Sequence, residues 1–426
     1  MAPRGIQTPQ PLAKEVQRVV SKPQARLAWP DIAKGISILG VILLHACLAV
    51  PDGMDSTLAA INRFLDPLRM PLFFLVSGYF SGKILNYSFG ELFFRRLWFF
   101  VVPYLAWVPV ELWLKFRELH ANEGQEMPEL KTYLWHIFFG ENMFWFLYAL
   151  VIFNIVLWLT RNLRPTTGLL VGFSPLLLVP FHSNYFLLGS AILYLPIFIA
   201  GTRLRPLISV HAAHYRNKPR ILRSVLMAMC GYGLFFFWSV LPADSIHAIP
   251  MPGTVMLGYE ELHIVSMLLI KLLVLPAGIL AVAWLAHIPV LSQALQFLGR
   301  HTLPLYLAHP IGNTIVFGYL ALGSGMVIRA DADSLMSRTT TWVLILVVVG
   351  LVGGLVFHGL SRLPIVGWSL TPPSLWGWWS TRHAARTTAT PSNGAQVLGK
   401  RVGKPVGKPV GESFGDSYGD SMARRL

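Results

Sequence analysis

Two histidines in this sequence stand within apolar segments, where ionisable side chains are uncommon. The stretch DIAKGISILGVILLHACLAV, residues 31–50, places His45 eleven residues after Lys34. At about 100° per residue, eleven residues make three turns and roughly 20° more, so the two side chains share one helix face about 16 Å apart. The stretch GRHTLPLYLAHPIG, residues 299–312, carries Tyr306 and, three residues later, His309. These two residues lie on one side of a second helix.

A histidine titrates near neutral pH and can therefore take a proton from a hydroxyl group. Ionisable residues inside spanning helices usually line a functional path, so we interpret His45, His309 and Lys34 as catalytic candidates. Two alternatives stay open. Each histidine could hydrogen-bond a neighbouring helix as a structural contact, and Lys34 could be a flank residue that reaches the membrane surface. Asp31, three residues before Lys34, could pair with it.

Two adjacent arginines, Arg95 and Arg96, occur in FFRRLWFFVVPY. They either anchor the chain at the inner membrane surface or bind an anionic phosphate group, which guanidinium groups do well. Arg69 is expected near the outer face, and we place it with Glu141 and Tyr306 among the substrate-binding candidates. The other outer acids could contact a sugar, but we expect them to face water instead: Asp52, Asp55 and Glu111.

The elements that hold these residues are predicted to be membrane helices. The chain has 426 residues, of which 54% are hydrophobic and only 13% charged, well below the roughly 25% usual for soluble domains. We predict an all-α polytopic membrane protein, a bundle of about ten transmembrane helices. The apolar segments lie near residues 32–50, 64–82, 98–114, 143–160, 166–182, 185–201, 224–241, 263–286, 301–321 and 341–360.

The distribution of basic residues predicts the orientation and the domain limits. Residues 1–28 form a basic leader, which the positive-inside rule places in the cytoplasm. Later loops alternate between basic and non-basic, so both termini are expected to be cytoplasmic. Residues 29–363 form the membrane domain, and residues 371–426, rich in Gly, Pro and Ser, are expected to be a disordered cytoplasmic tail. Gly78, Gly350 and Gly354 permit close helix contacts, for the last two either within one chain or between two.

Several other classes of function find no support. The formal net charge of +15 is explained by anionic lipid headgroups rather than by nucleic acid. Cys47 and Cys230 both fall in apolar segments, so no disulfide framework is expected. The sequence contains no GxxxxGK[ST] or HExxH motif and no Cys/His cluster with zinc spacing. We expect no bound metal.

Six motifs appear in one order: DIAKGISILGVILLH, MPLFFLVSGYF, RRLWFFVVPY, NMFWFLYAL, LPIFIAGTRL and LGRHTLPLYLAH. Together, from Trp29 to Leu363, they resemble the acyltransferase-3 family of integral membrane proteins. In that family the first span carries a basic residue, ten intervening residues and a histidine, which Lys34 and His45 match, with Lys in place of the usual Arg. An arginine-rich loop before a proline matches Arg95, Arg96 and Pro103.

The family's late Y..H pattern falls on Tyr306 and His309, with Thr302 in place of the usual Ser. The resemblance implies a membrane O-acyltransferase of the inner or plasma membrane. It implies that acyl-CoA, most often acetyl-CoA, docks from the cytoplasm against Arg95, Arg96 and Lys34. His45 then acts as a base or as a transient acyl carrier, and the acceptor is a hydroxyl of an extracytoplasmic glycan or glycolipid.

Two rival hypotheses stay open. The same polar cavity could serve a carrier or exporter of glycans or lipids, although the two halves of the sequence show no matched interrupted helices. The chain could also be a membrane scaffold without catalytic activity. The acyl chain and the acceptor are not determined by the sequence.

Overall fold

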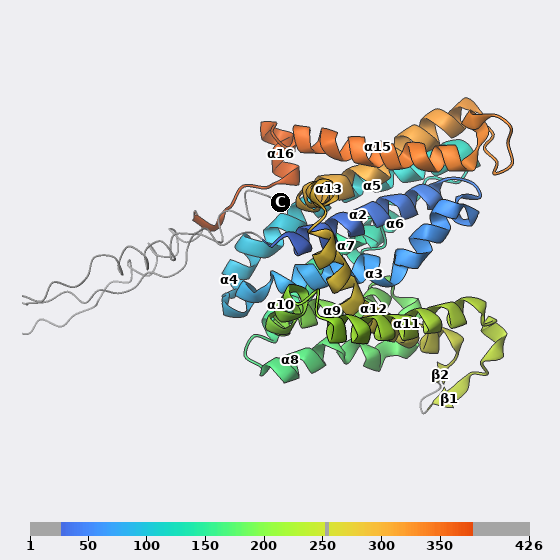
Figure 1. Ribbon diagram of the computed structural model, residues 1–426. Coiled ribbons are helices and arrows are strands. Elements are labelled where there is room, and N and C mark those ends of the chain that lie inside the picture. Colours follow the sequence, from blue (N-terminus) through green and yellow to red (C-terminus); the bar gives the residue numbers. More distant parts are fainter. Residues whose placement is uncertain (1–26, 252–254, 378–426) are drawn as a thin grey trace, which may run out of the picture.

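The computed structural model describes residues 27–251 and 255–377, which form a bundle of helices and one short β-hairpin (Figure 1). The strands of the hairpin are β1 (Ile249–Met251) and β2 (Val255–Leu257), which pair antiparallel. The α-helices are α2 (Ala28–Ala49), α3 (Thr57–Tyr79), α4 (Phe89–Leu92), α5 (Trp98–Glu123), α6 (Leu130–Phe139), α7 (Trp145–Leu159), α8 (Pro165–Gly172), α9 (Phe186–Arg203), α10 (Arg205–Ala213), α11 (Lys218–Val240), α12 (Tyr259–Leu285), α13 (Pro289–Arg300), α14 (Thr302–Asn313), α15 (Thr339–Leu360) and α16 (Pro364–Leu370).

Eight helices, or runs of joined helices, in the described part of the chain are long and apolar enough to cross a membrane. Each of the ten apolar segments expected from the sequence has a helical counterpart, but two do not reach that standard. Helix α7 has only 15 residues, and every 18-residue stretch of α3 contains Arg63, Asp66 and Arg69. A multi-pass membrane protein is therefore supported, whereas the number of ten spans is not confirmed.

Both ends of the described chain lie at the same end of the bundle (Figure 1). Helix α2 begins at this end, and the short helices α4, α10 and α16 gather there, while the β-hairpin lies at the opposite end. The leader and the tail expected from the sequence fall mainly on residues 1–26 and 378–426, which lie outside the described residues. Below, the end that holds α4 and α16 is called the inner end and the end that holds the hairpin the outer end.

Helix α2 is central, and packs against α3, α12, α13, α14 and α15. Helix α13 crosses its inner half so closely that glycine is required on both sides. A side chain at Gly35 would collide with the Leu295 backbone, and one at Gly299 would collide with the Asp31 backbone. The tight crossing fixes the inner end of α2, where Lys34 lies.

Small residues bring two further helix pairs together. Gly78 of α3 lies against the backbone of α9 at Phe198, as the sequence predicts. On α15, Gly350 lies against Ile42 and His309, and Gly354 lies against Leu305. The GLVGGL contact therefore forms within one chain, and it supports the helix that carries His309.

Two π-helical segments interrupt the bundle next to polar residues. The first, η3 (Phe93–Leu97), leads into α5 and contains Arg95 and Arg96. The second, η6 (Thr314–Ala321), continues α14 directly after Asn313. Because π-helical turns are energetically poor, they occur frequently at functional sites.

Candidate active site

His45 and His309 meet inside the bundle, from helices α2 and α14. His45 Nδ1 lies 2.7 Å from His309 Nε2. The ring planes differ by only 2°, and the ring centroids are 4.9 Å apart. A nitrogen contact this short between nearly parallel rings is an edge-to-edge hydrogen bond rather than a face-to-face stack. His309 is fully buried, whereas His45 is partly exposed.

A backbone carbonyl determines which nitrogens of the pair carry protons. His309 Nδ1 lies 3.1 Å from the Leu305 carbonyl oxygen, which can only accept a hydrogen bond. In the neutral ring, His309 Nδ1 is therefore the donor and Nε2 the acceptor, so His45 Nδ1 must donate to it. This assignment leaves His45 Nε2 with a free lone pair, and within residues 27–251 and 255–377 no hydrogen bond to that atom is formed.

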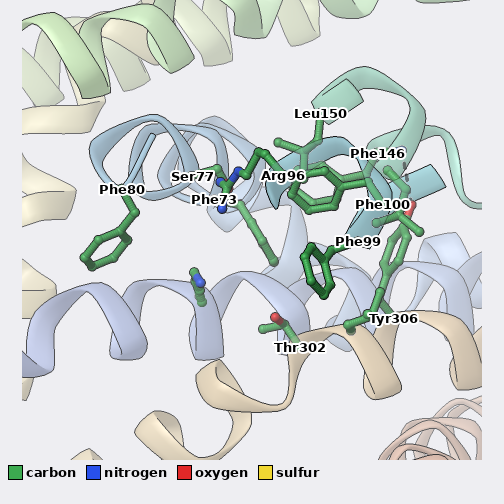
Figure 2. Close-up of a pocket in the computed structure, with 13 residues that line it drawn as sticks. Phe73, Ser77, Phe80, Arg96, Phe99, Phe100, Phe146, Leu150, Thr302 and Tyr306 are labelled. Atoms are coloured by element: carbon green, nitrogen blue, oxygen red, sulfur yellow. Dashed lines mark hydrogen bonds between the residues drawn. The ribbon is translucent and has the colours of Figure 1, made fainter. Parts of the chain in front are cut away.

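A pocket lies among helices α2, α3, α5, α7 and α14 (Figure 2), and neither His45 nor His309 is among its lining residues. Its polar residues come from four elements, and the remaining wall is formed mainly by aromatic rings and by leucines of α7 and α14. The Tyr306 ring closes the outer part of this pocket and lies 5.8 Å, centroid to centroid, from the His309 ring. The lining residues are Lys34, Phe73, Ser77, Phe80, Arg96, Phe99, Phe100, Phe146, Leu147, Leu150, Thr302, Leu303 and Tyr306.

The arrangement agrees with the resemblance noted in the sequence. The acyltransferase-3 sequence model, described as an acyltransferase domain, matches residues 27–381, which is most of the chain. The chain belongs to the acyltransferase-3 family. It is therefore a membrane acyltransferase in general terms. No curated protein and no solved structure matches it.

Lys34 of the acyltransferase domain is 9% exposed and lines the pocket. Its Nζ lies 6.0 Å from the centroid of the Phe80 ring. Asp31, the partner that the sequence suggests for Lys34, accepts a hydrogen bond from Arg300 Nε at 3.2 Å. Arg300 ends α13, so this ion pair ties the α13 crossing to the inner end of α2.

The adjacent arginines of η3 have different environments. Arg96 lines the pocket, and its Nη2 donates a hydrogen bond to Ser81 Oγ at 3.2 Å. Arg95 points away: its side chain is 40% exposed, lies 3.8 Å from Glu91 and stacks 4.2 Å from the centroid of the Trp376 ring. The structure therefore brings Arg96 to the same pocket as Lys34 but does not bring Arg95 there.

Tyr306 lines the pocket with its ring rather than with its hydroxyl. The hydroxyl donates to the Met143 carbonyl oxygen at 2.9 Å and accepts from the Phe146 backbone N–H at 3.2 Å. Both bonds go to the start of α7, in the NMFWF motif. Tyr306 thus joins α14 to α7 beside the histidine pair.

Arg69, expected near the outer face, is buried within the bundle at 7% exposure. It donates hydrogen bonds to Asn62 at 3.1 Å and Asp66 at 2.9 Å, and its side chain lies against Gly40 of α2. Lys271 of α12, which is buried, lies 3.8 Å from Asp66, whose side chain is 40% exposed, and completes an ionic cluster. The sequence signal for this cluster was Lys271, the lone lysine in the apolar run SMLLIKLLVL.

The two outer glutamates have different environments. Glu141, the substrate-binding candidate, lies at the turn between α6 and α7, where it accepts a hydrogen bond from Trp135 Nε1 at 3.0 Å and is about one-third exposed. Glu111, expected to face water, is instead 4% exposed. That expectation was wrong because Glu111 lies on the face of α5 that packs into the bundle.

Within the described residues, no group of three or more His, Cys, Asp or Glu could hold a metal ion. The chemistry at hand is that of an imidazole pair beside a pocket with two cationic side chains.

Proposed function

We propose that this acyltransferase moves an acetyl group from acetyl-CoA, bound from the cytoplasmic side, to a hydroxyl of an extracytoplasmic glycan or glycolipid. The observation that carries the proposal is the His45–His309 hydrogen bond beside a pocket that contains Lys34 and Arg96. In this proposal the protein lies in the inner or plasma membrane with both termini cytoplasmic, so that the inner end of the bundle meets the cytoplasm.

The charges of the pocket suit the proposed donor. Lys34 and Arg96 stand where the phosphates of acyl-CoA would need cationic partners. Phe73, Phe99 and Phe100 give the pocket an apolar wall, along which the thin pantetheine arm can carry the thioester toward the histidines. Lys34 and His45, eleven residues apart on α2, set the two ends of that route about 16 Å apart.

His45 Nε2 acts as the general base. It takes the proton of the acceptor hydroxyl while the hydroxyl oxygen attacks the thioester carbonyl carbon. The new C–O bond forms, the C–S bond breaks, and the sulfur leaves as the thiolate of CoA, which then gains the proton. His309 acts through His45, because its Nε2 accepts the His45 Nδ1 proton and so holds the imidazole in the tautomer that leaves Nε2 free.

Transfer of radiolabel from acetyl-CoA tests the proposal. Membranes that contain the intact protein, His45→Ala or the exposed-histidine control His214→Ala are compared at matched protein levels, and label is counted in lipid and glycan fractions. We expect label with the intact protein and His214→Ala and none with His45→Ala, and the labelled fraction identifies the acceptor class. Equal label in all three would contradict the role of His45. No label in any would contradict acetyl transfer and favour a carrier.

A further inference from the structure

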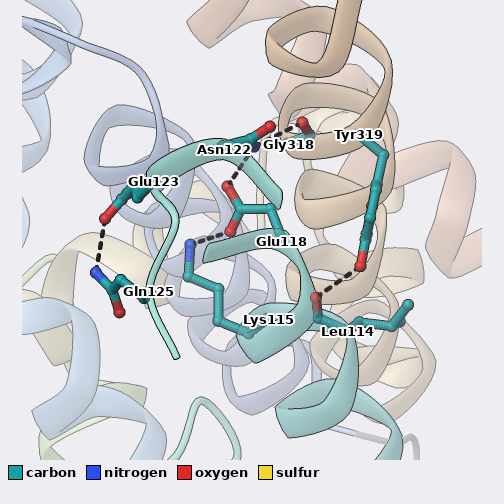
Figure 3. Close-up of polar contacts among 8 residues, drawn as sticks. All are labelled: Leu114, Lys115, Glu118, Asn122, Glu123, Gln125, Gly318 and Tyr319. Atoms are coloured by element: carbon teal, nitrogen blue, oxygen red, sulfur yellow. Dashed lines mark hydrogen bonds and ion pairs between the residues drawn. The ribbon is translucent and has the colours of Figure 1, made fainter. Parts of the chain in front are cut away.

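Two buried glutamates lie seven residues apart on α5, and only one of them is satisfied. Glu118 forms an ion pair with Lys115 and accepts a hydrogen bond from Asn122 Nδ2 at 3.3 Å (Figure 3). Asn122 also donates to the Gly318 carbonyl oxygen at 3.0 Å. Glu111 Oε2 is buried and receives no hydrogen bond from the described residues. Lys115 lies one turn from both glutamates, yet it pairs with Glu118.

Helix geometry places Glu111 on the face of α5 that lines the donor pocket. Phe100, a lining residue, lies eleven residues before Glu111, so the two share one face about 16 Å apart. The same spacing separates Lys34 from His45 on α2. Both helices run from the inner to the outer end of the bundle (Figure 1), so Glu111 lies beyond the pocket on the outer side, as His45 does.

The neighbours of Glu111 connect it to the histidine helix. Helix α5, which carries Glu111, packs against α14 and η6, and the Tyr306 ring of α14 lies 5.8 Å, centroid to centroid, from the His309 ring. On α14, Asn313 lies one turn beyond His309, is 6% exposed, and its Oδ1 is also buried without a hydrogen-bond donor among the described residues. Two acceptor oxygens from two helices therefore lack donors on the outer side of the histidine pair.

We propose that Glu111, together with Asn313, forms the acceptor subsite, where both oxygens accept hydrogen bonds from neighbouring hydroxyls of a polyhydroxylated acceptor. This inference rests on the proposed function. Buried acceptors without donors are costly unless a ligand or water satisfies them, and adjacent hydroxyls of a sugar ring supply donors in pairs. The bound acceptor then presents one further hydroxyl to His45 Nε2, opposite the donor.

The test uses the purified full-length protein in lipid nanodiscs with labelled acetyl-CoA. The acceptor probe is a total lipid and glycan extract of the native host's membranes. Transfer is measured against the concentration of extract and, separately, of acetyl-CoA. Glu111→Gln keeps the size of the side chain but removes its charge, and Glu118→Gln is the matched control, since it changes a buried glutamate of the same helix that is already partnered.

For Glu111→Gln we expect the half-saturating concentration of extract to rise at least tenfold while that of acetyl-CoA changes less than twofold. Glu118→Gln should leave both within twofold, and Glu111→Asp, which restores a carboxylate, should fall between Glu111→Gln and the intact protein. Size-exclusion profiles identify any variant that fails to fold. If Glu111→Gln does not fold, Asn313→Asp and Asn313→Ala replace it. The same rise in the half-saturating concentration is then expected for extract and not for acetyl-CoA.

An unchanged dependence on extract in Glu111→Gln would overturn the acceptor subsite alone, as would equal rises for extract and acetyl-CoA. No transfer by the intact protein to any fraction would instead overturn the proposed function and the subsite with it.

Discussion

Two polar regions of this bundle differ in how completely their groups are bonded. In the network of Lys115, Glu118 and Asn122, each side chain is bonded to another or to the Gly318 carbonyl. At the histidine pair, one ring nitrogen has a free lone pair, and Tyr306, whose ring lies 5.8 Å from the His309 ring, lines a pocket. In a membrane interior, a closed network fixes helices, whereas an open group retains the capacity to bind and react.

The closed network still serves the open site. Helix α14 continues into the π-helix η6, and the outer half of α5 holds this segment through Asn122 at Gly318 and through the Tyr319 hydroxyl, which donates to the Leu114 carbonyl oxygen at 3.1 Å (Figure 3). Because α14 carries His309, α5 holds the element that positions one member of the histidine pair. We therefore expect substitutions at the histidine pair to lower mainly the transfer rate, and substitutions in the closed network to lower mainly the stability of the fold.

The largest effect is expected from the open region, for His45→Ala. Loss of the general base should lower the rate of acyl transfer by at least about 100-fold, while the protein stays folded because His45 is only partly buried. Initial rates with labelled acetyl-CoA, together with thermal unfolding curves, measure the two effects. A loss of stability as large as the loss of rate would place His45 with the structural network instead.

The second-largest effect is expected for Arg96→Ala, which removes a cationic side chain from the proposed donor pocket. Hydrogen bonds to charged groups contribute about 1.5–3 kcal/mol, so the half-saturating concentration of acetyl-CoA should rise about tenfold to a hundredfold. Arg95→Ala is the matched control, with an expected change below about threefold, because its side chain points away from the pocket. Equal effects of the two substitutions would show that the donor contacts both arginines.

A substitution in the closed network is expected to lower the stability of the fold more than the transfer rate. Glu118→Ala removes the acceptor of an ion pair and of the Asn122 hydrogen bond, which should lower the free energy of unfolding by about 1–3 kcal/mol. The transfer rate at saturating substrates should fall less than about threefold. Denaturant unfolding in detergent, with rates on the same preparation, checks both numbers. A rate loss without destabilisation would contradict the structural role.

The smallest effect is expected for Tyr306→Phe, because Tyr306 lies between the two regions. The ring that lines the pocket stays, and only the hydroxyl bonds to Met143 and Phe146 are lost. A typical hydrogen bond contributes about 1 kcal/mol, so the free energy of unfolding should fall by about 1–2 kcal/mol. The transfer rate should fall by a few-fold. A rate loss comparable to that of His45→Ala would show that the hydroxyl contacts substrate.

The sequence allowed the family and the helical class to be predicted, because six ordered motifs and long apolar runs are local features. It also predicted that His45 and His309 reach similar depths, since the distances along each helix follow from the residue spacing. Three other outcomes could not be predicted in this way. Adjacent residues point about 100° apart, so only one of Arg95 and Arg96 could face the pocket, and the π-helical register of η3 decides which.

The burial of Glu111 was missed for a different reason. Its position in PVELWLKF suggests a flank residue near the outer surface, and only the packing of α5 against the bundle shows that the carboxylate points inward. The number of spanning helices likewise depends on tertiary structure. The charges of α3 exceed what an isolated apolar helix carries, and they are paired within the bundle as Arg69 with Asp66 and Lys271 with Asp66.

The central claim is that His45 activates an acceptor hydroxyl against an acyl thioester. Release of the CoA thiol from acetyl-CoA tests it most directly, because the thiol appears whichever molecule accepts the acetyl group. Purified protein in nanodiscs is supplied with acetyl-CoA and the membrane extract, and the intact protein is compared with His45→Gln. We predict thiol release that depends on extract and that falls at least about 100-fold in His45→Gln. Equal release by both proteins would contradict the account.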